Sequence, residues 1–137
     1  MERVINVPCL FSAVLVFLAL LVGWGGSEAS IISVTKNDSG GDVTVPMNGV
    51  FTIELKQTAG TGYVWAFDEL DREHFEILTE ETKPNAEPGR VGGPAIKVWV
   101  LRAKKIGTSL IRMLYFRPWE GKEKAEEAFE LRVHIER

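Results

Sequence analysis

Apolar and polar side chains alternate with a period of two along several short segments of this chain. In residues 50–56 (VFTIELK) one face is apolar and the other mostly polar, and residues 129–135 (FELRVHI) alternate most clearly. Residues 95–103 follow the same period, whereas residues 108–116 (TSLIRMLYF) are apolar on both faces apart from Arg112. The pattern predicts half-buried β-strands, with residues 108–116 as a central strand.

Shorter segments extend the strand pattern over the rest of the chain. Residues 31–35 and 42–46 are predicted to form a first strand pair around an Asn-Asp-Ser-Gly-Gly turn at 37–41. Residues 63–67 and 75–81 are two further strands. Seven to eight short strands, with no long segment of helical period, predict an all-β fold: an immunoglobulin-like antiparallel β-sandwich.

Residues 1–29 differ from the rest of the chain. Residues 10–22 form an apolar run of 13 residues that only Ser12 interrupts, and the small-x-small sequence Ser27-Glu28-Ala29 follows. This order is typical of a secretory signal peptide, and we expect cleavage after Ala29. An uncleaved membrane anchor is the alternative, but a membrane-spanning helix needs about 20 apolar residues. The sequence therefore predicts an exported domain at 30–137, which meets the membrane only through its signal segment.

Composition excludes several classes of function. The net charge of −3 and the scattered Lys and Arg residues give no basic patch for nucleic acid. The one cysteine, Cys9, lies in the signal segment, so the exported domain has no thiol nucleophile, thiolate ligand or disulfide. The two histidines, His74 and His134, have neither metal-site spacing nor an evident catalytic partner. We expect no enzyme, no metal or other cofactor and no small-molecule substrate.

Three loops break the strand rhythm, at residues 58–62 (TAGTG), 83–94 (KPNAEPGRVGGP) and 117–124 (RPWEGKEK). Binding residues commonly lie on loops that a rigid sandwich positions. Arg117 and Trp119 are residue types that often carry the binding energy of an interface. Turn formation alone is the simpler explanation for the glycines, because glycine readily adopts positive φ.

The aromatic residues near these loops have two possible roles. Trp119 either contacts a partner or folds back to cap the edge of the sandwich. Trp65 and Trp99 lie on predicted strands and are expected in the core, and Tyr63 is expected to pack at the base of its loop.

Together the three loops resemble those of the chagasin-type inhibitors of papain-like cysteine peptidases, over residues 45–136. That family has an Asn-Pro-Thr-Thr-Gly-Tyr loop, a glycine-rich loop ending Gly-x-Gly-Gly, and an Arg-Pro-Trp loop. The corresponding sequences here are Thr58-Ala59-Gly60-Thr61-Gly62-Tyr63, Gly89-Arg90-Val91-Gly92-Gly93 and Arg117-Pro118-Trp119-Glu120. Two departures stand out: the first loop lacks the Asn-Pro pair, which predicts a looser loop, and Arg90 replaces the first glycine of the second motif.

The resemblance implies a reversible, non-covalent inhibitor of papain-like cysteine peptidases that is not consumed. The three loops would occlude the active-site cleft, the first by entering it and the others by gripping its walls. The residues implied in peptidase binding are Thr58, Ala59, Gly60, Thr61, Gly62, Tyr63, Arg90, Val91, Gly92, Gly93, Arg117, Pro118 and Trp119. We expect a monomer. The alternative is an exported immunoglobulin-like module that binds another protein or a glycan.

Overall fold

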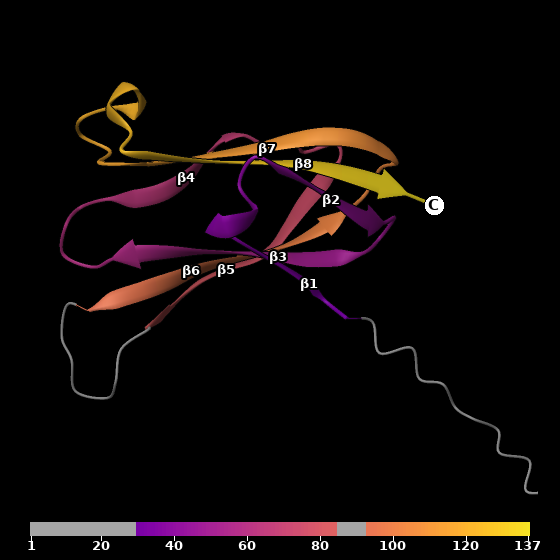
Figure 1. Ribbon diagram of the computed structural model, residues 1–137, viewed down its shortest axis with the longest axis horizontal. Helices are drawn as coiled ribbons and strands as arrows, with labels where there is room; N and C mark the ends of the chain where they lie inside the picture. The colour runs from indigo at the N-terminus through magenta and orange to yellow at the C-terminus, as the bar shows by residue number, and fades with distance from the viewer. Residues whose placement is uncertain (1–29, 85–92) are drawn as a thin grey trace, which may run out of the picture.

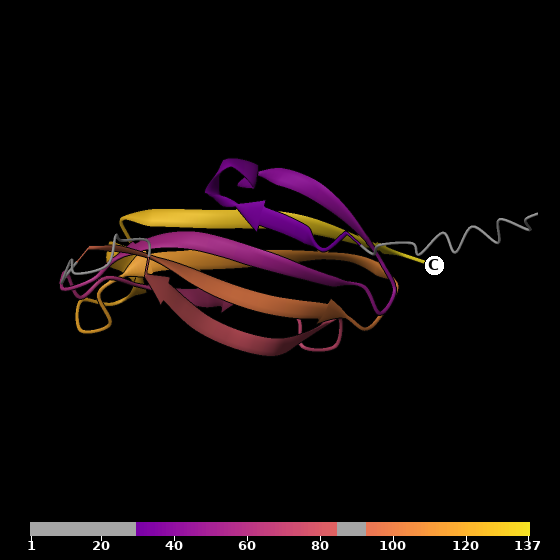
Figure 2. The ribbon, with the colours of Figure 1, turned by 90° about the horizontal axis from the view of Figure 1, so that it is seen from below.

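The computed structural model describes residues 30–84 and 93–137, which form two four-stranded sheets packed face to face (Figures 1 and 2). In chain order the elements are β1 (Ile32–Thr35), η1 (Lys36–Asp38), β2 (Gly41–Pro46), β3 (Val50–Thr58), β4 (Val64–Glu69), β5 (Phe75–Pro84), β6 (Pro94–Ala103), β7 (Gly107–Phe116), η2 (Lys122–Lys124) and β8 (Glu127–Glu136). The predicted all-β sandwich is confirmed. The predicted signal segment at 1–29 lies outside the described residues. No helix in the described ranges is long and apolar enough to span a membrane.

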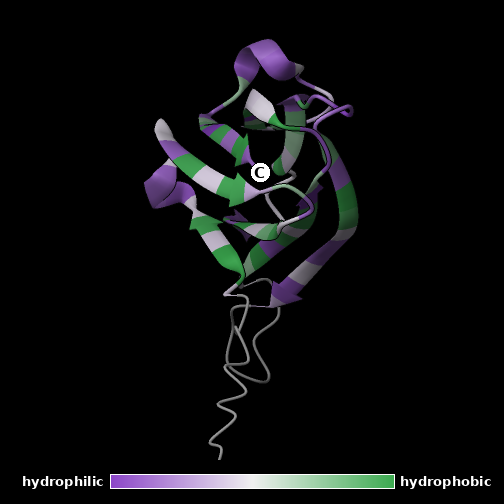
Figure 3. Ribbon diagram, turned by 90° about the vertical axis from the view of Figure 1, so that its right-hand side faces the viewer, coloured by the Kyte–Doolittle hydropathy of each residue, from purple (hydrophilic) through white to green (hydrophobic). Residues whose placement is uncertain are grey.

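The core lies between the sheets and comes from the alternating strands. One sheet has the order β1-β3-β6-β5 and the other the order β2-β8-β7-β4. Apolar bands recur along the strands in Figure 3. The inward-facing apolar side chains of β3 and β8 are buried, as the alternation predicts: Phe51, Ile53, Leu55, Phe129, Leu131, Val133 and Ile135. The largest fully buried side chains are Trp99, Phe51, Phe75 and Phe129. Burial of each such side chain stabilises the fold by about 1.5–3 kcal/mol.

The predicted pairing of the first two strands is wrong. β1 pairs in parallel with β3, and β2 pairs in parallel with β8 in the other sheet, so the sheets are mixed rather than purely antiparallel. The η1 turn separates them because Asp38 Oδ2 accepts hydrogen bonds from the Thr35 N–H (2.8 Å) and the Thr35 hydroxyl (3.2 Å). After this turn the Gly40 N–H donates to the Glu130 carbonyl of β8 at 2.8 Å, and β2 then pairs with β8.

Strand direction brings three connections to one end of the sandwich. β3, β5 and β7 run toward this end, and β4, β6 and β8 start from it, at the left of Figure 1. β7 is central in its sheet, between β8 and β4, as its two apolar faces predict. We call this end of the sandwich the loop end.

The opposite end carries the turn between β4 and β5. There the Phe75 N–H donates to the Asp71 carbonyl at 3.0 Å, which closes a single turn before β5. The Asp71 carboxylate accepts hydrogen bonds from the Glu73 N–H and from the His74 imidazole. Both bonds stabilise its charged form and lower its pKa, and the bond from Glu73 has the larger effect. The His74 imidazole is 2.7 Å from this carboxylate, so an acidic neighbour in the same turn accounts for the histidine.

Candidate functional site

The loop end gathers the connections that the sequence singles out. The β3–β4 connection is residues 59–63, the β5–β6 connection is 85–93 and the β7–β8 connection is 117–126. Thr58, the last residue of β3, pairs with Pro94, the first of β6, so the first connection begins beside the point where the second one ends. Arg90, Val91 and Gly92 lie outside the described residues. Gly93 is described and is half-buried beside this pair.

The first loop is a thin, exposed turn. Residues 58–61 are exposed, and Gly60 and Gly62 have φ values of +83° and +80°, which favour glycine. The Thr61 hydroxyl donates a hydrogen bond to the Thr58 carbonyl at 2.9 Å and accepts one from the Tyr63 N–H at 3.4 Å. Both hydrogen bonds of the hydroxyl lie within the loop, and they close the turn although the Asn-Pro pair of the family is absent.

Three stacked aromatic rings hold the base of the first loop. Tyr115 of β7 lies between Tyr63 and Trp65, with ring centroids 5.2 and 4.9 Å away. The Tyr115 hydroxyl accepts a hydrogen bond from the Thr58 N–H at 3.2 Å, and the Trp65 indole N–H donates to the Lys56 carbonyl at 2.9 Å. The expected packing of Tyr63 at the base of its loop is confirmed, and both Trp65 and Trp99 are buried as expected.

Tyr115 is the residue that sequence reasoning missed. It lies in a strand with two apolar faces, so periodicity gives it no special role. A signal was present: the hydroxyl of a buried tyrosine usually needs a hydrogen-bonding partner.

We predict that Tyr115→Phe loosens the first loop while keeping the stacked rings. The substitution removes the acceptor of the Thr58 N–H, so the free energy of unfolding should fall by about 1 kcal/mol. Amide hydrogen exchange measured by NMR should be faster at Thr58 than in the wild type. Unchanged protection of the Thr58 amide would show that the Tyr115 hydroxyl does not hold this loop.

Arg117 ties the third loop to the first. Its Nε donates a hydrogen bond to the Thr61 carbonyl at 3.0 Å, and its guanidinium carbon lies 4.5 Å from the centre of the Tyr63 ring. Glu120 lies 3.5 Å from the guanidinium, and the Glu120 N–H donates to the Arg117 carbonyl at 2.9 Å. Much of the Arg117 side chain is therefore engaged inside the molecule, where it joins the two loops.

Trp119 is the most exposed large apolar side chain in the described part of the protein, with 71% of its surface accessible. The outer edge of its six-membered ring lies against Gly62, where any β-carbon would overlap the indole. Each of the two alternatives for Trp119 is therefore partly right. The ring folds back onto the first loop, but its edge contacts Gly62 rather than the edge of the sandwich, and most of its surface remains exposed.

The chemistry of this end suits recognition rather than catalysis. Within residues 30–84 and 93–137, no cluster of three or more His, Cys, Asp or Glu side chains could hold a metal ion. The two histidines are engaged elsewhere, His74 with Asp71 and His134 with Thr108 at 2.9 Å. What the loop end offers is a narrow glycine-rich tip beside an exposed indole.

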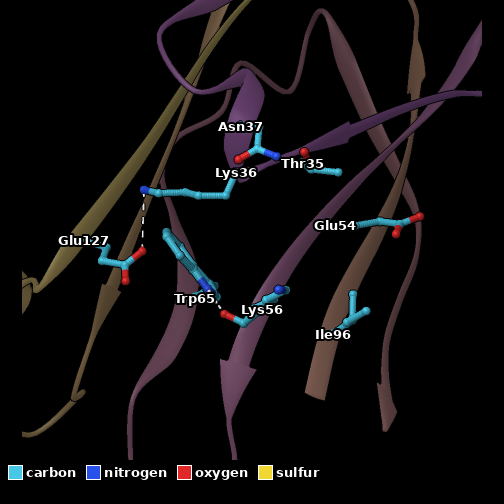
Figure 4. Close-up of a pocket in the computed structure, with 8 residues that line it drawn as sticks. All are labelled: Thr35, Lys36, Asn37, Glu54, Lys56, Trp65, Ile96 and Glu127. Atoms are coloured by element: carbon cyan, nitrogen blue, oxygen red, sulfur yellow. Dashed lines mark hydrogen bonds and ion pairs between the residues drawn. The ribbon is translucent and has the colours of Figure 1, made fainter. Parts of the chain in front are cut away.

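A separate cavity of about 450 Å³ opens at the side of the sandwich (Figure 4). Its lining mixes both signs of charge around one aromatic ring: Thr35, Lys36, Asn37, Glu54, Lys56, Trp65, Ile96 and Glu127. Lys36 extends over the Trp65 ring, 5.3 Å from its centre, and its ammonium group is 3.6 Å from the Glu127 carboxylate. The cavity touches the base of the first loop through Trp65 but not the exposed tip.

The fold defines a class of protein: a β-sandwich of two four-stranded sheets with three strand connections at one end. The profile of the chagasin family peptidase inhibitor I42 matches residues 44–133. The chain belongs to this family, and its members are inhibitors of peptidases rather than enzymes.

Relatives agree in sequence and in fold. The chain is 33% identical over 110 residues to Amoebiasin-2 of Entamoeba histolytica, covering 79% of this chain and 87% of the relative. The cysteine protease inhibitor EhICP2 from Entamoeba histolytica superimposes with a TM-score of 0.70 at 28% identity, covering 77% of this chain and 95% of that chain. The fold is also similar to that of PbICP-C, solved in complex with falcipain-2, with a TM-score of 0.56 at 19% identity and coverages of 77% and 91%.

Proposed function

We propose that this protein is a reversible, non-covalent inhibitor of papain-like cysteine peptidases whose loop end occludes the active-site cleft. The observation that carries the proposal is the pairing of a thin exposed tip, residues 58–61, with the exposed Trp119 on the third loop, which Arg117 fixes to the first. Membership of the chagasin family supports it, as does the likeness to a cysteine protease inhibitor at 28% identity.

The first loop is the part suited to enter the cleft. A papain-like peptidase keeps a reactive thiolate at the bottom of a narrow groove. Ala59 and Gly60 carry almost no side chain, so the tip is narrow enough to approach that thiolate. We propose that the peptide bonds of the loop escape cleavage because Arg117 and Thr61 hold the backbone away from the attack geometry. A misplacement of about 1 Å can slow a reaction about a hundredfold.

The other two loops would grip the walls of the cleft. Trp119 supplies a large apolar surface, and Pro118 restricts the backbone before it, which reduces the entropy lost on binding. The second loop, with Arg90, Val91, Gly92 and Gly93, would lie along the opposite wall. A footprint of standard size, on the order of 1,600 Å² in total, supports tight binding.

An inhibition panel tests the proposal. Residues 30–137 carry every strand of the sandwich and would be assayed at micromolar concentration against papain, several cathepsin L-like enzymes and one serine peptidase. We expect inhibition of the cysteine peptidases alone, recovery of activity on dilution, and an inhibitor mass that is unchanged after incubation. Lack of inhibition across all the cysteine peptidases would refute the proposed function.

We also propose that the protein acts as an exported monomer after loss of residues 1–29. The apolar run and the small-x-small sequence that ends at Ala29 support this. When the full chain is expressed in a cell that secretes it, the exported protein should begin at Ser30 by N-terminal sequencing. A membrane-bound product that retains the apolar run would favour the anchor instead.

A further inference from the structure

The return limb of the third loop, residues 121–126, has its own attachment to the sandwich. It forms the η2 turn, which stands above the sheet that contains β7 and β8 (Figure 1). The Lys124 N–H donates to the Gly121 carbonyl at 3.2 Å, and the Ala125 N–H to the Lys122 carbonyl at 3.0 Å. From this turn the Lys122 ammonium group donates a hydrogen bond to Asp68 Oδ1 on β4 at 3.1 Å.

Asp68 is placed for this contact by an irregularity in its strand. The pairing of β4 with β7 shifts register between Phe67 and Glu69, so Asp68 is the extra residue of a β-bulge. Bulges redirect a side chain and are features of the fold rather than defects. One carboxylate oxygen of Asp68 holds Lys122, and the other lies 3.9 Å from Arg112 Nε on β7.

Asp68 is shared between two cations, Lys122 and Arg112. The Nε of Arg112 lies 3.4 Å from the Glu130 carboxylate as an ion pair, yet it is buried and makes no hydrogen bond to any described residue. Removing Lys122 would therefore leave Asp68 with a second cation already beside it. The cost to the fold should be small, whereas the attachment of η2 would be lost.

We propose that Lys122 and Asp68 are positioning residues that fix the third loop so that the edge of the Trp119 ring stays against Gly62. The loop leaves β7 at Phe116 and re-enters the sheet at Glu127, so it is fixed at the front by Arg117 and at the back by Lys122. This inference rests on the proposed function for its effect on inhibition. Its effect on loop position is independent of any peptidase.

The test compares Lys122→Met with Lys124→Met in residues 30–137. Both substitutions remove one positive charge from η2, but Lys124 makes no ion pair within the described ranges, so it controls for charge steering. We expect Lys122→Met to weaken inhibition of papain by about two- to fivefold, the range for an exposed ion pair, and Lys124→Met to leave it unchanged. Thermal midpoints of the two variants should agree. The difference in inhibition should vanish at 1 M salt, where the Debye length is about 3 Å.

NMR supplies a readout that needs no peptidase. Gly62 lies at the edge of the Trp119 ring, so the ring current displaces the resonances of its α-protons. Lys122→Met should move these resonances toward their random-coil positions, and Lys124→Met should not. In an Asp68→Asn background, Lys122→Met should have no further effect on either readout, because the two residues act as a pair.

The outcomes separate the two proposals. Equal inhibition and equal Gly62 resonances in the two lysine variants would overturn the positioning role. So would a fall in the thermal midpoint of Lys122→Met that matches its loss of inhibition, which indicates a purely structural role. If the wild type inhibits no cysteine peptidase, the proposed function fails, and the Gly62 resonances still decide whether Lys122 positions the loop.

Discussion

Replacing Gly62 with alanine should weaken peptidase inhibition about 30-fold or more, because Trp119 must leave its place. The residue has φ +80°, which costs an L-amino acid about 1–2 kcal/mol. That strain acts on free and bound inhibitor alike and lowers the free energy of unfolding, not the affinity. The loss of affinity comes from the indole, which the new methyl group displaces. Loss of a central aromatic anchor typically costs about 2 kcal/mol or more.

Gly40→Ala is the matched control for this prediction. Gly40 has φ +83° in the turn between β1 and β2, and an added β-carbon would meet nothing within 4 Å. The two variants should lose comparable stability in chemical denaturation, but Gly40→Ala should inhibit as the wild type does. Equal inhibition by both variants would mean that the contact between Trp119 and Gly62 has no role in binding.

Trp119→Ala should weaken inhibition by about 30- to 1,000-fold, which corresponds to 2–4 kcal/mol, the range for an interface hot spot. The thermal midpoint should change little, because 71% of the side chain is exposed to solvent in the free protein. Inhibition constants against papain and thermal melts of the same preparations give both quantities.

Ile106→Ala is the control for removal of an exposed apolar side chain. Ile106 is 43% exposed and lies in the connection between β6 and β7, at the end opposite the loops. It should leave inhibition unchanged. A large fall in the midpoint of Trp119→Ala with unaltered inhibition would make Trp119 a structural residue of the fold.

The sequence predicted the parts of the fold that depend on local pattern. β3 and β8 alternate, and the apolar side chains on their inward faces are buried as expected. β7 is central in its sheet, as its two mostly apolar faces predict. The pairing partners of the strands depend on contacts between distant residues. After the turn at Lys36–Asp38, β1 and β2 join different sheets. A run of turn-forming residues predicts a turn, but it does not predict which strand the chain pairs with afterwards.

In the candidate site, too, local features could be predicted from the sequence, whereas contacts between distant residues could not. Glycine and proline content located the first and third loops, and Gly60 and Gly62 have the positive φ that turns require. The hydrogen bond that joins these two loops could not be predicted, because it connects Arg117 to the Thr61 carbonyl, 56 residues earlier in the chain. The residue type suggested a contact with a partner, whereas the structure uses the guanidinium largely inside the molecule. The ion pair between Asp68 and Lys122 escaped notice for the same reason, because its partners are 54 residues apart.

The central claim is that the loop end occupies the active-site cleft, and one binding measurement tests it most directly. Calorimetric titration would compare free papain with papain whose active-site cysteine carries a bulky covalent peptidyl inhibitor. We predict 1:1 binding of residues 30–137 to the free enzyme and no measurable binding to the blocked one, since the first loop and the covalent group need the same space. Equal affinity for both forms would contradict the account, because the inhibitor would then bind away from the cleft.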